Sequence, residues 1–185
     1  LYHGNCLDVL PTLPAQSVDA IIADPPYGTT ACKWDSVIPL DAMWRELKRV
    51  IKPRGAVVLF AAQPFTSALV MSNAGWFKYE LIWDKVAVVG VGAAKHMPLK
   101  SHENMLVFYR ESPTYNPQFG DACKPFGKLS PTGSVTNGVM GTERQCGVGY
   151  PKSIVRHMRP NNLTGGGLHP TQKPVELLRY LVRTY

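Results

Sequence analysis

VDAIIADPPYG, residues 18–28, carries the main signal for the fold class, because an apolar run typical of a buried strand ends directly in a turn with two prolines. Its first six residues form a short apolar run, which is typical of a strand buried on both faces. The two prolines cannot continue a central strand, since they have no N–H to donate to a neighbouring strand. The aspartate between the strand and the prolines cannot contribute to an apolar core, so it indicates a functional site rather than a core position.

Strand and helix patterns alternate along the chain from this stretch. Apolar runs indicate buried strands, and apolar residues at helical spacing indicate amphipathic helices. Pro53 and Gly55 are expected to end the first of the helices. The alternation predicts an α/β fold, with a mostly parallel sheet and helices on both faces. The predicted elements are a strand over 18–23, a helix over 39–52, a strand over 55–60, a helix over 64–75, strands over 79–85 and 104–110, and a helix over 175–185.

Composition and charge narrow the possible function. The 185 residues suit one domain with a hydrophobic core, and no apolar run is long enough to predict a membrane span. The net charge of +7 is uneven, since residues 95–159 carry 9 Lys and Arg against 4 Asp and Glu. This basic excess suits a polyanion such as DNA, although a solvated basic surface explains it too. The four scattered cysteines predict reduced thiols in a cytoplasmic protein and no metal site.

The turn after the first strand carries the chemistry. In open α/β sheets the ligand site forms beyond the carboxyl ends of the strands, so Asp24 to Tyr27 should line it. The carboxylate of Asp24 and the carbonyl of Pro25 make two acceptors that match the two N–H bonds of a planar amino group. The ring of Tyr27 offers a flat face on which the ring bearing that amino group can stack. A Pro-Pro turn capped by aspartate is the simpler interpretation of the same residues.

With these residues the sequence resembles the amino-methylating DNA methyltransferases, in the permuted group that has its target-recognition region between two catalytic halves. The resemblance is carried by HGNCLDVLPTLPAQSVDAIIADPPYG, WRELKRVIKPRGAVVLF, SHENMLVFYR and HPTQKPVELLRYLVRTY, and so covers nearly the whole chain. It implies a Rossmann-like fold that binds S-adenosylmethionine. It also implies that Asp24 and Pro25 bind the target amino group, that Pro26 holds the turn, and that Tyr27 stacks on a flipped base.

The resemblance further implies where the cofactor lies. The residues expected to bind it are Asn5, Asp24, His169, Thr171 and Lys173. Relatives often have Asp where this chain has Asn5, whose side-chain oxygen is a weaker acceptor. The family's glycine-rich cofactor loop falls after the helix over 175–185, so we expect either a fragment of a longer protein or a product that binds cofactor poorly. Gly90 to Gly92 lack that loop's acidic and aromatic companions, and a mobile loop beside the DNA is expected there instead.

The resemblance divides the chain into three parts. Residues 1–110 would form the catalytic half, 111–167 the target-recognition region, rich in Gly, Pro, Asn, Ser and Thr, and 168–185 the incomplete start of the cofactor-binding half. The target-recognition region holds basic residues that suit contacts with phosphates or bases of double-stranded DNA. These candidates are Lys124, Lys128, Lys152, Arg156 and Arg159.

The resulting expectation is a DNA methyltransferase that transfers a methyl group from S-adenosylmethionine to adenine N6, with no metal and no membrane partner. Bacterial or phage origin, a cytoplasmic location, a homodimer and a partner restriction enzyme are all compatible with the resemblance. Cytosine N4 methylation is the nearest alternative, although Asp rather than Ser at position 24 favours adenine in this family. A non-catalytic DNA-binding remnant is the alternative from another class. A dehydrogenase is more distant, because no G-x-G-x-x-G follows the first strand.

Overall fold

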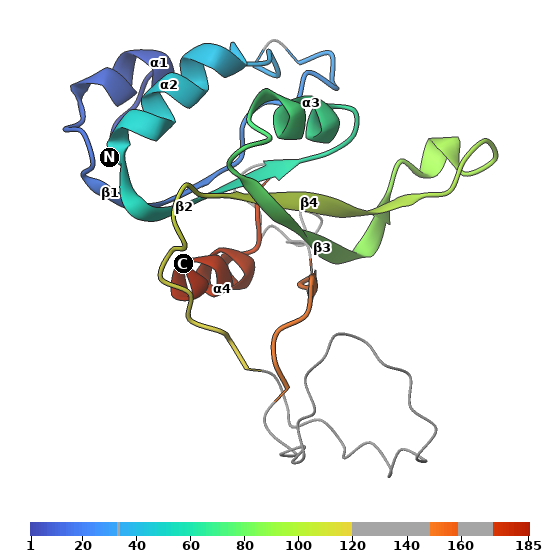
Figure 1. The fold of residues 1–185 in the computed structure, drawn as a ribbon. Coiled ribbons are helices and arrows are strands. Elements are labelled where there is room, and N and C mark those ends of the chain that lie inside the picture. Colours follow the sequence, from blue (N-terminus) through green and yellow to red (C-terminus); the bar gives the residue numbers. More distant parts are fainter. Residues whose placement is uncertain (33, 120–148, 159–171) are drawn as a thin grey trace. The chain divides into compact units, whose positions relative to one another are not determined.

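The computed structural model of the chain describes residues 1–32, 34–119, 149–158 and 172–185 (Figure 1). Its strands form one five-stranded sheet, and helices pack against that sheet. In chain order they are α1 (Cys6–Val9), the 3-10 helix η1 (Leu10–Thr12), β1 (Val18–Ala23), α2 (Leu40–Val50), β2 (Ile51–Ala61), α3 (Phe65–Ser72), β3 (Phe77–Val89), the 3-10 helix η2 (Val91–Ala93), β4 (Lys100–Phe108), β5 (Ile154–Arg156) and α4 (Val175–Thr184).

The sheet has the strand order β1-β2-β4-β3-β5. β1 pairs with β2 and β3 pairs with β5 in parallel, whereas β4 is antiparallel to both of its neighbours. Four strands therefore run in one direction and β4 alone runs against them, because β3 and β4 form a hairpin. The predicted α/β fold with a mostly parallel strand direction is confirmed, and β4 makes the sheet a mixed one.

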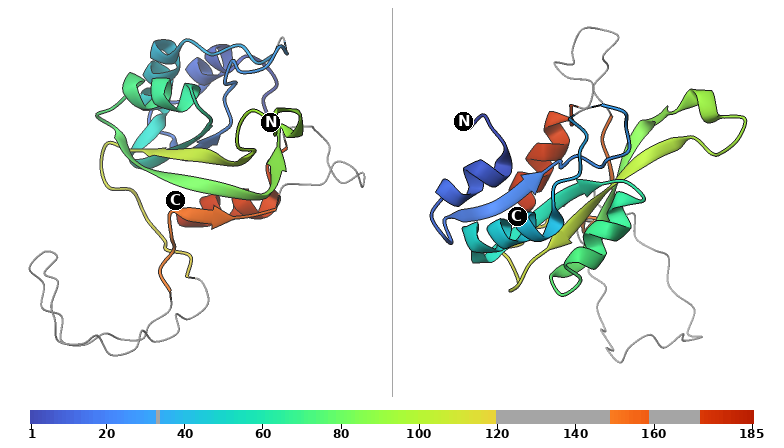
Figure 2. Two further views of the ribbon diagram at one scale, coloured as in Figure 1. Left: turned by 90° about the vertical axis from the view of Figure 1, so that its right-hand side faces the viewer. Right: turned by 90° about the horizontal axis from the view of Figure 1, so that it is seen from above.

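Both faces of the sheet are covered by helices (Figures 1 and 2). Side chains alternate along β2, so that Val57, Leu59 and Ala61 pack with α2 and α3, while Val58 and Phe60 pack with α4. This alternation follows from the two-residue period of a strand. The core therefore consists of two apolar layers, and each fully buried large side chain contributes about 1.5–3 kcal/mol to stability.

The boundary between α2 and β2 differs from the prediction. α2 ends at Val50 and β2 begins at Ile51, so Pro53 and Gly55 lie inside the strand rather than after the helix. The pairing of β1 with β2 shifts register between Val18 and Ala20, which leaves room for the proline in an irregular segment. A Cβ added to Gly55 would lie 2.6 Å from Ile51 Cγ1 and 2.7 Å from the Asp19 carbonyl oxygen, so this close approach requires glycine.

β5 lies within the segment for which the sequence predicts no regular structure. Ile154 pairs with Ile82 and Arg156 pairs with Asp84, which places the strand at the edge of the sheet. Three residues are too few for a period-2 pattern to indicate a strand, and only the tertiary pairing with β3 forms it.

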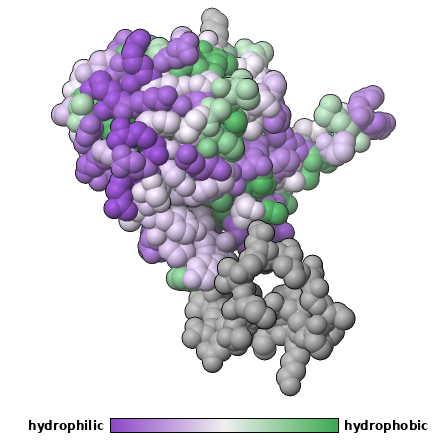
Figure 3. All heavy atoms as spheres, viewed as in Figure 1, coloured by the Kyte–Doolittle hydropathy of each residue, from purple (hydrophilic) through white to green (hydrophobic). Residues whose placement is uncertain are grey.

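The β3–β4 hairpin extends past the other strands (Figures 1 and 2). Its turn contains Gly90, which has a φ of 78°, followed directly by η2. Both hydrophobic and hydrophilic residues lie on the surface of this extension (Figure 3). The exposed large apolar side chains on it include Val86, Val88, Val91 and Met97. The expected role of this segment beside DNA stays a prediction.

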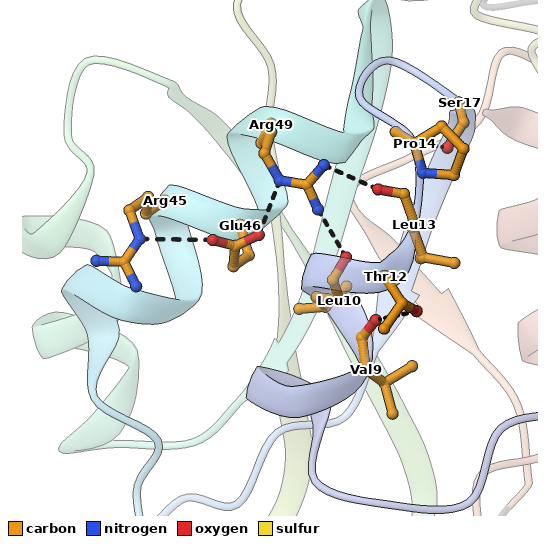
Figure 4. A network of polar contacts seen from close by, with 9 residues as sticks. All are labelled: Val9, Leu10, Thr12, Leu13, Pro14, Ser17, Arg45, Glu46 and Arg49. Carbon is orange, nitrogen blue, oxygen red and sulfur yellow. Dashed lines mark hydrogen bonds and ion pairs between the residues drawn. The ribbon is translucent and has the colours of Figure 1, made fainter.

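An arginine on α2 forms hydrogen bonds to the segment that leads into β1 (Figure 4). Arg49 donates hydrogen bonds to the carbonyl oxygens of Leu13, at 2.8 Å, and Leu10, at 2.7 Å. Its Nε donates to Glu46 at 2.9 Å, so the guanidinium is held on its own helix as well. These contacts fix the start of β1, whose other end leads to Asp24.

The chain folds into two compact units. One consists of Leu1–Asn116 with Ser153–Tyr185 and contains the whole sheet, and the other is Pro117–Lys152, which lies within the predicted target-recognition region. The described part of the second unit includes an edge-on ring contact between Phe119 and Tyr150, whose centroids are 5.2 Å apart. Among the helices of the described ranges, none is long and apolar enough to cross a membrane.

Candidate active site

The turn that follows β1 is held by the carboxylate of one aspartate. Asp35 Oδ1 accepts hydrogen bonds from the backbone N–H groups of Tyr27, at 2.8 Å, and Gly28, at 2.9 Å. Its Oδ2 accepts from Thr29, at 2.9 Å, and Thr30, at 2.7 Å. The turn therefore closes around this carboxylate, in the manner of the backbone concavities that bind anions.

The same bonds explain the acidity of Asp35. Burial opposes ionisation of this side chain, which is 8% exposed, but the N–H donors outweigh it and lower its pKa to about 2. Gly28 allows the turn because its φ is 67°, and a Cβ there would lie 2.7 Å from Val37 Cγ2. The residues between Asp24 and Gly28 are thus fixed by Asp35 and not by a helix or strand of their own.

Asp24 presents its carboxylate at the end of β1 and is held on both oxygens. Its Oδ1 accepts a hydrogen bond from the Tyr27 hydroxyl at 2.7 Å, and its Oδ2 forms an ion pair with Lys173 at 2.9 Å. The side chain is 34% exposed, so solvent or a ligand can reach it. An ionised carboxylate has about four acceptor positions, which leaves two for a ligand.

Lys173 lies just before α4 and brings a buried ammonium group to this carboxylate. Its side chain is only 10% exposed, and its Nζ lies 2.9 Å from Glu103 Oε2 as well as from Asp24. The rings of Phe60, Tyr27 and Trp83 lie near the same ammonium, with centroids 5.0, 5.8 and 5.8 Å from Nζ. Carboxylates and ring faces both stabilise a cation, and they compensate the charge buried here.

Glu103 on β4 connects two lysines. Its carboxylate contacts Lys173 through one oxygen and Lys85, on β3, through the other. Burial by itself would raise the pKa of Glu103, but the two ammonium groups outweigh it and hold the pKa below the usual range. Glu103 is therefore ionised at neutral pH. Together with Asp24 and the two lysines it forms a group of four charged side chains that has no net charge.

Tyr27 is a fixed hydrogen-bond donor in this site. Burial, followed by the charges of Glu103 and Asp24, raises the pKa of its phenol far above the usual value, so the hydroxyl stays protonated. Its ring stacks on Phe65, with centroids 5.5 Å apart and planes 19° from parallel. One face of the ring is thus covered by protein, which leaves at most the other face for a base.

Other residues predicted for the site are placed as follows. Pro25 and Pro26 are partly buried in the turn, next to Asp24. Asn5 caps α1, and its Oδ1 accepts from the Leu7 N–H at 3.1 Å.

Arg156 on β5 pairs with Asp84 at 2.9 Å. Lys152 is exposed and belongs to the second unit. The predictions for Lys124, Lys128, Arg159, His169 and Thr171 lie outside the described residues.

Three residues of the site were not predicted from the sequence: Asp35, Lys85 and Glu103. Lys85 and Glu103 carry a usable signal, because each is a charged residue directly next to an apolar run of its strand, and such a charge is costly unless it has a partner. Asp35 has no comparable signal, since an acid in a polar loop is ordinary. Within the described ranges, no group of His, Cys, Asp and Glu has the arrangement of a metal site.

Fold and site together define a Rossmann-like α/β domain with a charged site at the carboxyl end of its first strand. Residues 18–185 match the family described as DNA methylase (N6_N4_Mtase). Because this match spans most of the sequence, the chain belongs to the DNA methylase family.

Similar proteins agree with this membership. The type II methyltransferase M.HinfI of Haemophilus influenzae is 26% identical over 133 residues, a match that covers 57% of this chain and 36% of that protein. This chain thus spans little more than a third of the length of that curated relative.

Solved structures show the same fold. PvuII DNA methyltransferase, described as cytosine-N4-specific, matches with a TM-score of 0.65 at 13% identity, over 99% of this chain and 68% of that one. M1.HpyAVI, in a complex with SAM, matches with a TM-score of 0.57 at 19% identity, over 99% of this chain and 74% of that one.

Proposed function

We propose that this chain forms the part of a DNA methyltransferase that presents a flipped base for methylation, with adenine N6 as the target and S-adenosylmethionine as the methyl donor. The observation that carries the proposal is the placement of Asp24. Its carboxylate stands at the carboxyl end of β1, where open α/β sheets bind their ligands, and is held by Tyr27 and Lys173 while still accessible.

The proposed chemistry depends mainly on positioning. Asp24 and the carbonyl of Pro25 accept the two N–H bonds of the amino group, which orients the nitrogen lone pair. The ring of Tyr27 supports the base, and the hydroxyl of Tyr27 donates a hydrogen bond to Asp24. The new N–C bond would form as the methyl–sulfur bond of the donor breaks and leaves a neutral thioether. The methylated amino nitrogen would then release one proton, which Asp24 can accept and pass to solvent.

The charges of the site fit the amino-acid end of S-adenosylmethionine, which carries a carboxylate, an ammonium and a sulfonium. Lys173 would hold the carboxylate, and the carboxylate of Asp24 suits a cationic group of the cofactor. When bound, the cofactor supplies an electrophilic methyl group. Asn5, His169 and Thr171 remain predicted cofactor contacts, and Lys124, Lys128, Lys152, Arg156 and Arg159 remain predicted contacts to double-stranded DNA.

Cytosine N4 is the second candidate target, since one protein with the same fold is described as cytosine-N4-specific. Both targets are exocyclic amino groups on flat rings, and Asp24 with Pro25 can accept from either. Asp24 favours adenine through the family resemblance.

The test is transfer of tritiated methyl groups from S-adenosylmethionine to unmodified double-stranded DNA by the full-length protein. Digestion of the product to nucleosides then identifies the methylated base. The proposal predicts N6-methyladenine, whereas N4-methylcytosine would establish the second candidate. DNA binding without any methyl transfer would favour a non-catalytic DNA-binding remnant over both.

A further inference from the structure

Four charged side chains of alternating sign form a continuous chain of contacts through the site. They lie in the order Lys85, Glu103, Lys173, Asp24, and each contacts the next. Three of them are nearly inaccessible, with side-chain exposures of 8% for Lys85, 13% for Glu103 and 10% for Lys173. Buried charges are expensive unless each is paired, so removal of one member alone leaves its partner uncompensated.

Glu103 is the member best fixed by the fold. It lies on β4 directly opposite Trp83 of β3, and the next residue, Asn104, pairs with Ala61 of β2. Lys173, by contrast, lies in the non-helical segment before α4 and reaches the site with a long, flexible side chain. The position of the Lys173 ammonium is therefore set by the carboxylate of Glu103, which is itself anchored by Lys85.

Glu103 also contacts both residues that hold Asp24. Lys173 Nζ lies 2.9 Å from Glu103 Oε2, and the hydroxyl of Tyr27 lies 3.5 Å from the same oxygen. Asp24 receives one contact from each of these two groups. Without the Glu103 charge, the ammonium of Lys173 would have Asp24 as its nearest anionic partner, and the carboxylate of Asp24 would be drawn toward it.

We propose that Glu103 is a positioning residue for methyl transfer, which holds Lys173 and Tyr27 so that the carboxylate of Asp24 keeps the orientation needed to accept an amino group. This inference rests on the proposed function. Glu103 affects the reaction through Lys173 and Tyr27 and does not contact the reacting nitrogen itself. A displacement of about 1 Å at a reacting group can lower the rate about 100-fold, so such a residue has a measurable effect.

The test compares Glu103→Gln with Glu80→Gln in the full-length protein. Glu80 is an exposed glutamate on β3 that accepts a hydrogen bond from Asn104 and lies outside the charged group. We expect Glu103→Gln to lower kcat for DNA methylation by about 10-fold to 100-fold, with the KM for DNA within about twofold. Glu80→Gln should leave both constants unchanged. A kcat within about threefold of wild type in Glu103→Gln would overturn the proposal.

A second variant covers the risk that a lone substitution prevents folding. Glu103→Gln leaves the buried Lys85 without its carboxylate, whereas Glu103→Gln with Lys85→Met removes one charge of each sign and leaves Lys173 paired with Asp24. The double variant should fold, as circular dichroism would show, and should have the same loss in kcat. A folded double variant with wild-type kcat would overturn the proposal.

Dependence on Lys173 is measured by repeating Glu103→Gln in a Lys173→Gln background under single-turnover conditions. If Glu103 acts through Lys173, its substitution there should change the methylation rate less than about threefold. An equal loss in both backgrounds would contradict action through Lys173. Failure of the proposed function is distinct from these outcomes, because wild-type protein would then transfer no methyl group at all.

Discussion

Lys173 Nζ lies 2.9 Å from Asp24 Oδ2, so the site joins the end of β1 to the segment that precedes α4. The two residues come from opposite sides of the segment that separates the two predicted catalytic parts. Because Lys173 is buried among aromatic rings, this contact is an internal one and not a surface ion pair of little energetic value. The stability of the turn after β1 and the docking of α4 are therefore linked through the site.

Asp35→Asn should destabilise the protein and disturb the turn that carries Tyr27. Asparagine retains one acceptor oxygen, but its NH2 group faces N–H donors that the carboxylate satisfied. Hydrogen bonds to a charged group contribute about 1.5–3 kcal/mol, so we expect a loss of about 2–3 kcal/mol in the free energy of unfolding. Urea denaturation of the variant and wild type measures this difference.

The effect of Asp35 should depend on pH in a defined direction. Its pKa is lowered to about 2 in the folded protein, below the value of about 3.9 for an unperturbed aspartate. Its stabilising contribution is therefore complete above about pH 5 and is lost as the pH falls through about 4 toward 2. The stability difference between wild type and Asp35→Asn should shrink over that window. A difference that stays constant down to about pH 2.5 would contradict the assigned hydrogen bonds.

Arg49→Ala should destabilise the fold more than Arg45→Ala. Arg49 fastens two backbone carbonyls before β1, whereas Arg45 makes only a 3.5 Å ion pair with Glu46 on the same helix and is 74% exposed (Figure 4). We expect a loss of about 1–3 kcal/mol for Arg49→Ala and less than about 0.5 kcal/mol for Arg45→Ala. Thermal or urea unfolding compares the two, and equal losses would show that the carbonyl contacts contribute little.

Lys152→Ala and Arg156→Ala test the predicted DNA contacts. Each phosphate contact that is lost should reduce the slope of log K against log salt concentration by about 1. The Arg156 side chain forms an ion pair with Asp84 but is 74% exposed, so its guanidinium remains accessible to DNA. Lys52→Ala, which removes an exposed ion pair with Asp19 outside the predicted target-recognition region, is the control. An unchanged slope in either test variant would remove that residue from the predicted interface.

The sequence predicts the helices and strands well where the pattern is long. The strand over 18–23 and the C-terminal helix are confirmed nearly to the residue, because burial on one or two faces enforces a clear apolar period. The predicted end of α2 is wrong by a few residues, since the β1–β2 register shift accommodates Pro53 within a strand. β5 was not predicted because its formation depends entirely on pairing with β3.

For the site, the sequence indicates the residues that carry the chemistry but not those that position them. Asp24 and Tyr27 are recognisable because they directly follow a predicted buried strand, where open α/β sheets bind ligands, and because the turn resembles the family's catalytic motif. The proposed positioning roles of Glu103, Lys85 and Asp35 depend on contacts between segments apart in the chain. The charges of Lys85 and Glu103 next to apolar runs indicate that each needs a partner, but no local pattern identifies that partner. Their roles follow only from the distances in the folded chain.

Methyl transfer in the proposed function depends on the Asp24 carboxylate, which binds the amino group that is methylated. The most direct test of this role is the methyl-transfer rate of Asp24→Asn compared with Asp19→Asn, which changes an exposed aspartate on the same strand, β1. We predict that Asp24→Asn lowers kcat at least about 100-fold with an unchanged circular dichroism spectrum, and that Asp19→Asn retains wild-type kcat. Methyl transfer by a folded Asp24→Asn variant at the wild-type rate would contradict this role of Asp24.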